Sequence, residues 1–254
     1  MFTAPDEAHY QRQYLDWITR AWAATGQEPP RTVLDLGCGQ GRLLIPLARR
    51  HPASECAGVD LSTHAVTQAR DYAAREGVTN VRFRDIRIEQ ALAEAAPESV
   101  ELVIMTEVTL FMPEWRRALD RMSEVVRPGG LMAVAFRSQY FDALCVAQTR
   151  RWEQVDTLLQ ARKGKLFGGD TVFTWQTSGE IRRLIEDEFG FELLELVGIG
   201  CCSGISGDPH AEIVRPSVLG ATEAADLLRL ELALARDVPD AGRYLLAVAR
   251  KPSA

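Results

Sequence analysis

Hydrophobic positions along the chain change their spacing several times, and each change predicts a different element. Over residues 6–24, apolar side chains recur every three or four positions, which is typical of an amphipathic helix. After the breaker TGQEPP, short apolar runs alternate with helical repeats. We expect strands at 32–37, 55–60, 81–85, 100–106 and 131–136, with helices at 41–51, 62–76, 88–95 and 113–126 between them.

This alternation predicts the fold class. Apolar runs of five to seven residues, each followed by a helix, are typical of a parallel sheet covered on both faces. Right-handed crossovers make such a chain an open, doubly wound α/β sheet. Residues 138–177 read as an insertion with one helical segment at 142–162 and no clear strand rhythm. The remainder predicts helix 178–189 capped by Ser178, strand 191–199, helix 222–236 and strand 243–250, which completes a mostly parallel seven-stranded sheet.

The composition excludes several classes of partner. The 254 residues carry 29 basic and 35 acidic side chains, and this net charge of −6 disfavours general nucleic-acid binding. No apolar run approaches the roughly 20 residues that span a bilayer, and MFTAPDEAHYQRQ lacks the pattern of a signal peptide. The five cysteines form no CxxC pair. We therefore expect a cytoplasmic protein that binds neither nucleic acid nor membrane.

The segment VLDLGCGQGR, residues 33–42, lies where the first strand ends and a helix begins. Its three alternating glycines allow a sharp turn and a close approach of backbone to a ligand, and the helix behind them offers free N–H groups to an anion. A plain tight turn is the alternative interpretation. The GxGxG spacing after the acidic Asp35 differs from the GxGxxG of dinucleotide sites.

Acidic residues also end the next two strands. Asp60 follows Gly41 by nineteen residues, and its carboxylate is suited to both hydroxyls of a ribose. Asp85 is suited to an adenine amino group, with Ile86 packing on the ring. Each residue alone is also explained as a helix cap or a loop charge. Three acidic residues on three successive strand ends, facing one crevice, are harder to explain as caps.

These motifs, together with ELVIMTEV and the RPGG turn, resemble the class I S-adenosylmethionine-dependent methyltransferases over residues 31–137, and more loosely over 178–250. The resemblance implies a Rossmann-like methyltransferase fold, S-adenosylmethionine as cofactor and S-adenosylhomocysteine as product. It places the glycine loop against the methionine portion, Asp60 at the ribose, Asp85 with Ile86 at the adenine, and Thr106 with Glu107 beside the methyl group. The implied cofactor-binding residues are Asp35, Gly37, Cys38, Gly39, Gly41, Asp60, Leu61, Asp85, Ile86, Thr106 and Tyr14.

The same resemblance organises the chain as a single methyltransferase domain over 1–254. Within it we expect an N-terminal cap helix at 1–30, a cofactor-binding half at 31–137, a lid or insertion at 138–177, and a C-terminal half at 178–254 that completes the sheet.

Two residues are candidates for removing a proton from the methyl acceptor. Glu107 ends the fourth strand and points toward the crevice, although a solvated loop residue is an equally good interpretation. His210 lies in the glycine-rich loop after the sixth strand, where a surface histidine in a long connection is the alternative. Asp208, His210 and Glu212 have the chemistry of metal ligands but no recognised spacing, so we expect no metal.

Aromatic side chains in the first helix and the insertion suit a small, mostly apolar acceptor. In similar enzymes these segments close over the cofactor, although such rings also merely attach helices to a sheet. The candidate substrate-binding residues are Tyr10, Tyr140, Phe111 and Trp175. TEVTLFMP stands where relatives that methylate DNA bases or glutamine carry N/D-P-P-Y/F. The paired-glutamate loop of arginine-methylating relatives does not occur either. With the acidic net charge, this leaves small molecules as methyl acceptors.

The leading hypothesis is therefore methyl transfer to oxygen, nitrogen or carbon of a small molecule, by a monomer or homodimer. A second hypothesis is a catalytically silent partner subunit that binds the nucleoside. A nicotinamide-dependent oxidoreductase is a third, which the GxGxG spacing disfavours.

Overall fold

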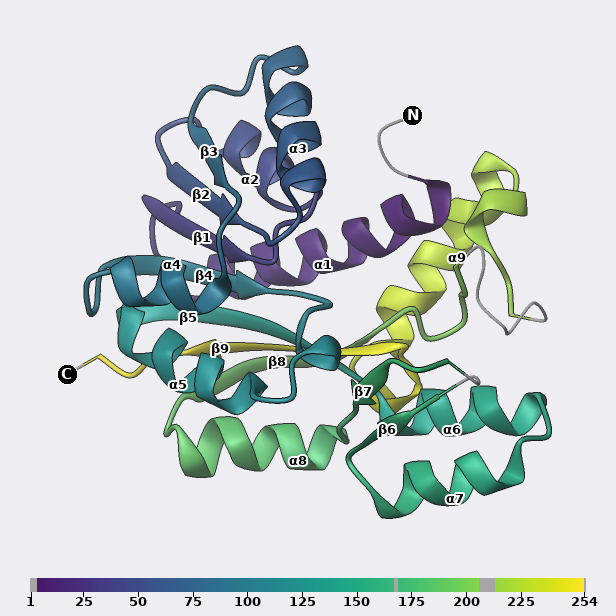
Figure 1. Ribbon diagram of the computed structural model, residues 1–254. Helices are drawn as coiled ribbons and strands as arrows, with labels where there is room; N and C mark the ends of the chain where they lie inside the picture. Colours follow the sequence, from purple (N-terminus) through teal and green to yellow (C-terminus); the bar gives the residue numbers. More distant parts are fainter. Residues whose placement is uncertain (1–3, 167–168, 206–212, 254) are drawn as a thin grey trace.

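The computed structural model describes residues 4–166, 169–205 and 213–253. A seven-stranded sheet with the order β3-β2-β1-β4-β5-β9-β8 forms its centre (Figure 1). The five N-terminal strands are parallel, whereas β9 runs antiparallel to both β5 and β8. The strands are β1 Thr32–Leu36, β2 Glu55–Val59, β3 Val81–Arg84, β4 Val100–Met105, β5 Val126–Arg137, β8 Glu192–Ile199 and β9 Tyr244–Arg250. The predicted doubly wound fold is confirmed.

Helices cover both faces of this sheet because alternate strand residues are apolar on both sides. One core lies under the first group of helices and contains Val33 of β1, whereas Leu34 and Leu36 of the same strand enter the core on the other face. The first face is covered by α1 Pro5–Ala24, α2 Leu44–Arg50 and α3 Thr63–Arg75, and the second by α4 Ile88–Glu94, α5 Trp115–Val125 and α8 Ser178–Arg183.

The insertion differs from its prediction. In place of one helix over 142–162, the chain forms α6 Gln139–Gln148 and α7 Trp152–Gln160, separated at Arg150, whose φ is +58°. A short antiparallel hairpin of β6 Lys163–Lys165 and β7 Val172–Thr174 follows. Figure 1 shows these four elements grouped at one end of the sheet. They have a small core of their own, built on Val146, Leu158, Leu166 and Trp175.

Several predicted boundaries also need correction. The N-cap of α8 is Thr177, whose hydroxyl accepts the N–H of Glu180 in a capping box, while Ser178 donates to Asp240 instead. The helix gives way to a π-type turn at Leu184–Glu188. β5 begins at Val126 and so includes the RPGG segment, and α5 begins at Trp115 and not at Pro113. The C-terminal helix is α9 Ala221–Leu234.

Within the described part of the chain, no helix has both the length and the apolar character that crossing a bilayer requires.

Candidate active site

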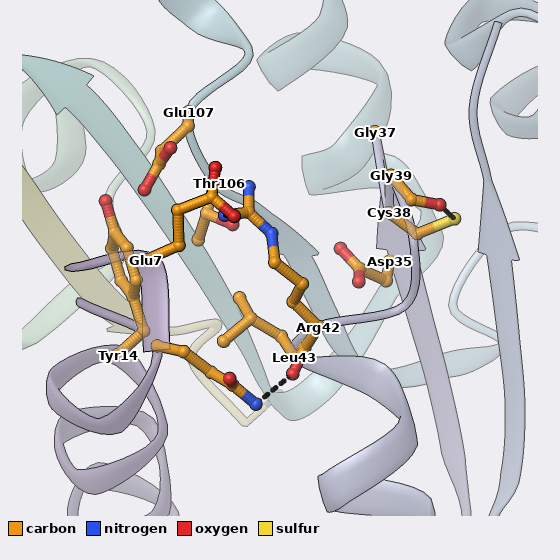
Figure 2. A pocket seen from close by; sticks show the side chains of 11 residues that line it. Glu7, Tyr14, Asp35, Gly37, Cys38, Gly39, Arg42, Leu43, Thr106 and Glu107 are labelled. Carbon is orange, nitrogen blue, oxygen red and sulfur yellow. Dashed lines mark hydrogen bonds and ion pairs between the residues drawn. The ribbon is translucent and has the colours of Figure 1, made fainter. Parts of the chain in front are cut away.

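A pocket opens at the carboxyl ends of β1 and β4, where the strand order reverses (Figure 2). Doubly wound sheets bind ligands at this switch point. Three elements form the wall: the start of α1, the loop after β1, and the residues that follow β4. The lining residues are Glu7, Gln11, Tyr14, Asp35, Gly37, Cys38, Gly39, Arg42, Leu43, Thr106 and Glu107.

Backbone conformation shapes the loop after β1. Gly37 and Gly39 have φ values of +79° and +51°, which a residue with a Cβ adopts only at a cost. The N–H groups of Gly37 and Cys38 both donate to the Val59 carbonyl, at 2.8 and 2.9 Å, and so hold the turn against β2. A Cβ on Gly37 would run into the Val108 side chain, whereas one on Gly39 would meet nothing within 4 Å. The loop therefore packs tightly behind Gly37 and leaves free space at Gly39.

Asp60 ties this loop to the next strand. Its Oδ2 accepts the Gly39 N–H at 2.9 Å, and its Oδ1 accepts the Ser62 N–H at 2.8 Å. Ser62 itself is the N-cap of α3. Each carboxylate oxygen retains a lone pair after these bonds, so Asp60 can still accept hydrogen bonds from a ligand. Leu61 is 65% exposed beside it.

The three strand ends lie level with one another. Leu36 pairs with Val59, and Val59 pairs with Arg84, so the residues that follow them start from the same edge of the sheet. Asp85 is exposed there; its carboxylate accepts from the Thr63 hydroxyl at 3.2 Å and lies 3.9 Å from Arg70. Ile86 is half-buried next to it. The structure thus brings Asp60 and Asp85 to the edge that carries the pocket, beyond the pocket's own lining.

Asp35 is almost fully buried at the base of the pocket. Burial, and then repulsion from Asp60, raise its pKa to about 7, while Arg42 acts in the opposite direction. A carboxyl group with this pKa exists in both protonation states near neutral pH. A cation in the pocket would favour the ionised state.

Glu107 follows β4 in a left-handed conformation, with φ of +59°. A non-glycine residue in this region is strained, and such strain is typical of functional positions. Burial raises the pKa of Glu107, against the opposing effect of Arg42 and Arg243. Figure 2 shows its carboxylate next to the hydroxyl of Tyr14, on the side of the pocket away from Asp35 and the glycine loop. The Tyr14 hydroxyl is buried, and a hydrogen bond from it to Glu107 partly offsets the rise in the pKa of that carboxylate.

The structure does not bring the other aromatic candidates to this pocket. Tyr10 is buried, and its hydroxyl donates to the Ser203 carbonyl at 2.7 Å. Trp175 is fully buried in the insertion core, where its Nε1 donates to the carbonyls of Leu158 and Ala161. These two side chains stabilise the fold, and their buried positions do not fit the predicted role in substrate binding. Phe111 is 58% exposed and packs against Phe173, with ring centroids 5.5 Å apart.

Tyr140 is 53% exposed and lines a separate groove with Val238 and Pro239. His210, like Asp208 and Glu212, lies outside the described residues. Across the described ranges, no group of three or more His, Cys, Asp or Glu residues is arranged to hold a metal ion.

One face of α1 lines the pocket with the predicted Tyr14 and with two residues, Glu7 and Gln11, that the sequence analysis missed. Their spacing of four and three residues was the available signal, but the aromatic positions of the same helix dominated its pattern. Arg42, directly after the glycine loop, was also missed.

The opposite side of α1 is fixed by a buried carboxylate. Glu231 of α9 is fully buried and accepts hydrogen bonds from His9 at 2.6 Å and from Gln13 at 2.7 Å. It also accepts the N–H groups of Cys202 and Ser203, at 2.7 and 2.8 Å. Burial alone would raise the pKa of Glu231, but these hydrogen bonds outweigh it and hold the pKa below its usual value. One side chain therefore joins α1, α9 and the loop after β8.

The chain is similar to known methyltransferases in sequence and in fold. Residues 33–130 match the methyltransferase domain family. A ubiquinone biosynthesis O-methyltransferase of Sinorhizobium fredii is 38% identical over 169 residues, which are 66% of this chain and 59% of the relative. An arsenite methyltransferase of Halobacterium salinarum is 32% identical over 178 residues, which are 70% of this chain and 41% of the relative. The matches thus span about half the length of these relatives.

Solved structures show the same fold at low sequence identity. The plantazolicin methyltransferase in complex with S-adenosylhomocysteine superposes with a TM-score of 0.61 at 15% identity, over 96% of this chain and 85% of its own. The 4+2 cyclase SpnF superposes with a TM-score of 0.58 at 19% identity, over 96% of this chain and 82% of its own.

The fold and the pocket define a doubly wound α/β protein with a nucleoside-type site at its switch point. Residues 33–130 carry a methyltransferase domain, and the sheet around it has the fold of the class I S-adenosylmethionine-dependent methyltransferases. The described residues fit that cofactor: the space at Gly39 would admit it, and the Asp60 carboxylate keeps lone pairs for the ribose hydroxyl groups.

Proposed function

We propose that this protein transfers the methyl group of S-adenosylmethionine to an oxygen, nitrogen or carbon atom of a small molecule. The observation that carries the proposal is the level row of strand ends at which Asp60 fixes Gly39 beside the pocket, with Asp35 before the loop and Asp85 beyond it. A row of acidic side chains next to an open glycine backbone suits a cationic ligand that also carries ribose hydroxyl groups.

Each part of the cofactor has a matching group. Asp60 would accept the ribose hydroxyl groups on its remaining lone pairs, with Leu61 beside the sugar. Asp85 would accept from the adenine amino group, and the half-buried Ile86 would pack on the ring. Asp35 and the loop from Gly37 to Gly41 would contact the methionine portion.

When bound, the cofactor supplies a methyl group on a positively charged sulfur, which an acceptor atom displaces in line. The protein then contributes alignment, exclusion of water and removal of a proton. Glu107 is suited to the last task because its carboxylate lines the pocket and burial raises its pKa, which strengthens it as a base. Glu107 would take up the acceptor's proton as the acceptor forms its bond to the methyl carbon and the carbon–sulfur bond breaks. Tyr14 lies beside this carboxylate and would orient it or the acceptor.

A small molecule is the class of acceptor that the relatives and the charge of the chain favour. The curated relatives named above are an O-methyltransferase and an arsenite methyltransferase, so both oxygen and a heavier atom are represented. The negative net charge and the small pocket support a small molecule over a nucleic acid. We further propose that the protein acts in the cytoplasm, in line with its five free cysteines.

The proposal is tested in two stages. Calorimetry with S-adenosylhomocysteine and with a nicotinamide dinucleotide establishes which nucleoside binds. Methyl-labelled S-adenosylmethionine is then incubated with catechol, with arsenite and with a cell extract filtered to small molecules. Label on a small molecule supports the proposal. Binding of S-adenosylhomocysteine without transfer in any of these would indicate the silent partner subunit, and binding of the dinucleotide alone would indicate an oxidoreductase.

Replacing Glu107 by Gln tests the assigned base in the same assay. The rate of transfer should fall by about 10²- to 10⁴-fold, because the amide cannot take up the proton, while affinity for S-adenosylhomocysteine changes little. A variant that turns over at the wild-type rate would show that another group removes the proton or that the acceptor needs no base.

A further inference from the structure

Arg42 extends into the pocket from the residue directly after the glycine loop (Figure 2). Its side chain is one-third exposed. Of the described residues that line the pocket, Arg42 is the one with a positive charge, whereas Glu7, Asp35 and Glu107 are acidic. If a ligand carries both charges, three acidic side chains in this lining could pair with its cationic group, whereas one side chain, that of Arg42, could pair with its anionic group.

The guanidinium of Arg42 already holds a carboxylate. Its Nη1 lies 3.2 Å from Oε2 of Glu7, in the first turn of α1. The backbone of Arg42 is fixed as well, because the side chain of Gln11 donates to its carbonyl oxygen. Arg42 is thus anchored at its main chain, while its charged end pairs with a partly exposed side chain of another element.

We propose that Arg42 binds the carboxylate of the amino-acid portion of S-adenosylmethionine, and that Glu7 occupies the guanidinium until the cofactor replaces it. This inference rests on the proposed function. The amino-acid portion carries an ammonium and a carboxylate group on one carbon atom. Asp35 at the base of the pocket suits the ammonium group, and the planar fork of an arginine suits the carboxylate.

The exchange leaves both partners in acceptable surroundings. Glu7 has a side chain 44% exposed, so it can return to water when it is released. It also lies in the first turn of α1, where the helix dipole favours a negative charge even without Arg42. Glu7 therefore acts as an internal competitor that keeps the guanidinium paired in the absence of the cofactor.

The test compares two ligands that differ in the amino-acid portion. S-adenosylhomocysteine has the carboxylate, and 5′-methylthioadenosine lacks the whole amino-acid group. Arg42→Gln should lower the affinity for S-adenosylhomocysteine by about 10- to 100-fold, the usual effect of losing a charged pair, and change that for 5′-methylthioadenosine by less than about 2-fold. Arg12→Gln, which removes the same charge from an exposed position of α1, should change neither affinity.

A second variant separates binding from a structural ion pair. Glu7→Gln removes the competitor, so affinity for S-adenosylhomocysteine should stay unchanged or rise by a few-fold. A loss like that of Arg42→Gln would show that the Glu7–Arg42 pair merely supports the pocket, and would overturn the inference. Equal losses for both ligands in Arg42→Gln would also overturn it.

Failure of the cofactor assignment on which the proposed function depends gives a different result. In that case the wild-type protein would bind neither S-adenosylhomocysteine nor 5′-methylthioadenosine. If the wild type binds S-adenosylhomocysteine and Arg42→Gln binds it equally well, the cofactor assignment stands and only the role of Arg42 is wrong.

Discussion

The two walls of the pocket are built in different ways. The wall from β1 consists of backbone: turns at positive φ, N–H groups fixed to Val59, and a glycine N–H held by Asp60. The wall from α1 consists of side chains, and the helix itself is fixed from behind by Glu231, 218 to 222 residues distant in sequence. The first wall depends on local sequence. The second depends on contacts between segments that meet only in the folded chain.

The largest effect is expected where the second wall is anchored. Glu231→Ala leaves His9, Gln13 and two backbone N–H groups without their acceptor in a buried place. It should lower the free energy of unfolding by about 3–5 kcal/mol, measured by urea denaturation. Asp226→Ala, at an exposed position of the same helix, should cost less than about 0.5 kcal/mol. Similar values for the two variants would contradict the anchoring role of Glu231.

A somewhat smaller effect concerns the buried acid beside the first wall. Because the folded state raises the pKa of Asp35 to about 7 from 3.8, the folded state holds this proton more tightly than the unfolded chain. Stability should therefore fall as pH rises from about 4 to about 7, by about 2–4 kcal/mol, and then level off. Glu107 acts in the same direction. Asp35→Asn should remove much of this slope in urea titrations between pH 4.5 and 8, and an unchanged slope would refute the assignment.

Asp60 connects the first wall to the ligand. Asp60→Ala removes a carboxylate that fixes Gly39 and would accept from the ribose, so cofactor affinity should weaken by about 1.5–3 kcal/mol in calorimetry with S-adenosylhomocysteine. Asp71→Ala, at an exposed position of α3, serves as the matched control and should bind normally. Unchanged affinity in Asp60→Ala would remove this residue from the site.

Two glycines separate strain from crowding. Gly37 and Gly26 have positive φ values of +79° and +69°, but only at Gly37 would a Cβ meet another side chain, that of Val108. Both Ala variants carry the strain of a left-handed residue, and Gly37→Ala should lose about 1–3 kcal/mol more in thermal or urea unfolding. Equal losses would mean that Val108 moves aside and that the tight packing behind the loop is unimportant.

The same division explains what could be predicted from the sequence. Apolar runs, glycines and acidic strand ends are local signals, so the sheet and the row Asp35, Asp60 and Asp85 were predicted together. Arg42 and Glu7 are ordinary surface residues until the fold brings them together. Glu231 lies among leucines on an amphipathic helix. Nothing nearby in sequence shows that its carboxylate oxygens accept hydrogen bonds from side chains of α1.

Other errors arose where a signal was present but short. Thr177 and Ser178 are adjacent candidates for a cap, and the T-x-x-E spacing to Glu180 favours the first. The strands of the insertion hairpin have three residues each, too few for an alternating pattern to be visible.

The level pairing of Leu36, Val59 and Arg84 limits how this region can evolve. Deleting one residue from β2 would draw Asp60 back by about 3.3 Å and turn alternate side chains to the wrong face. Substitutions in β2 leave this alignment in place, whereas insertions and deletions destroy it. Natural variation in length should therefore concentrate on the opposite edge of the sheet and in the insertion. A length change in α2 or its loops should keep Asp60 in place relative to Gly41 only if the chain has returned to its original pairing register before β2 begins.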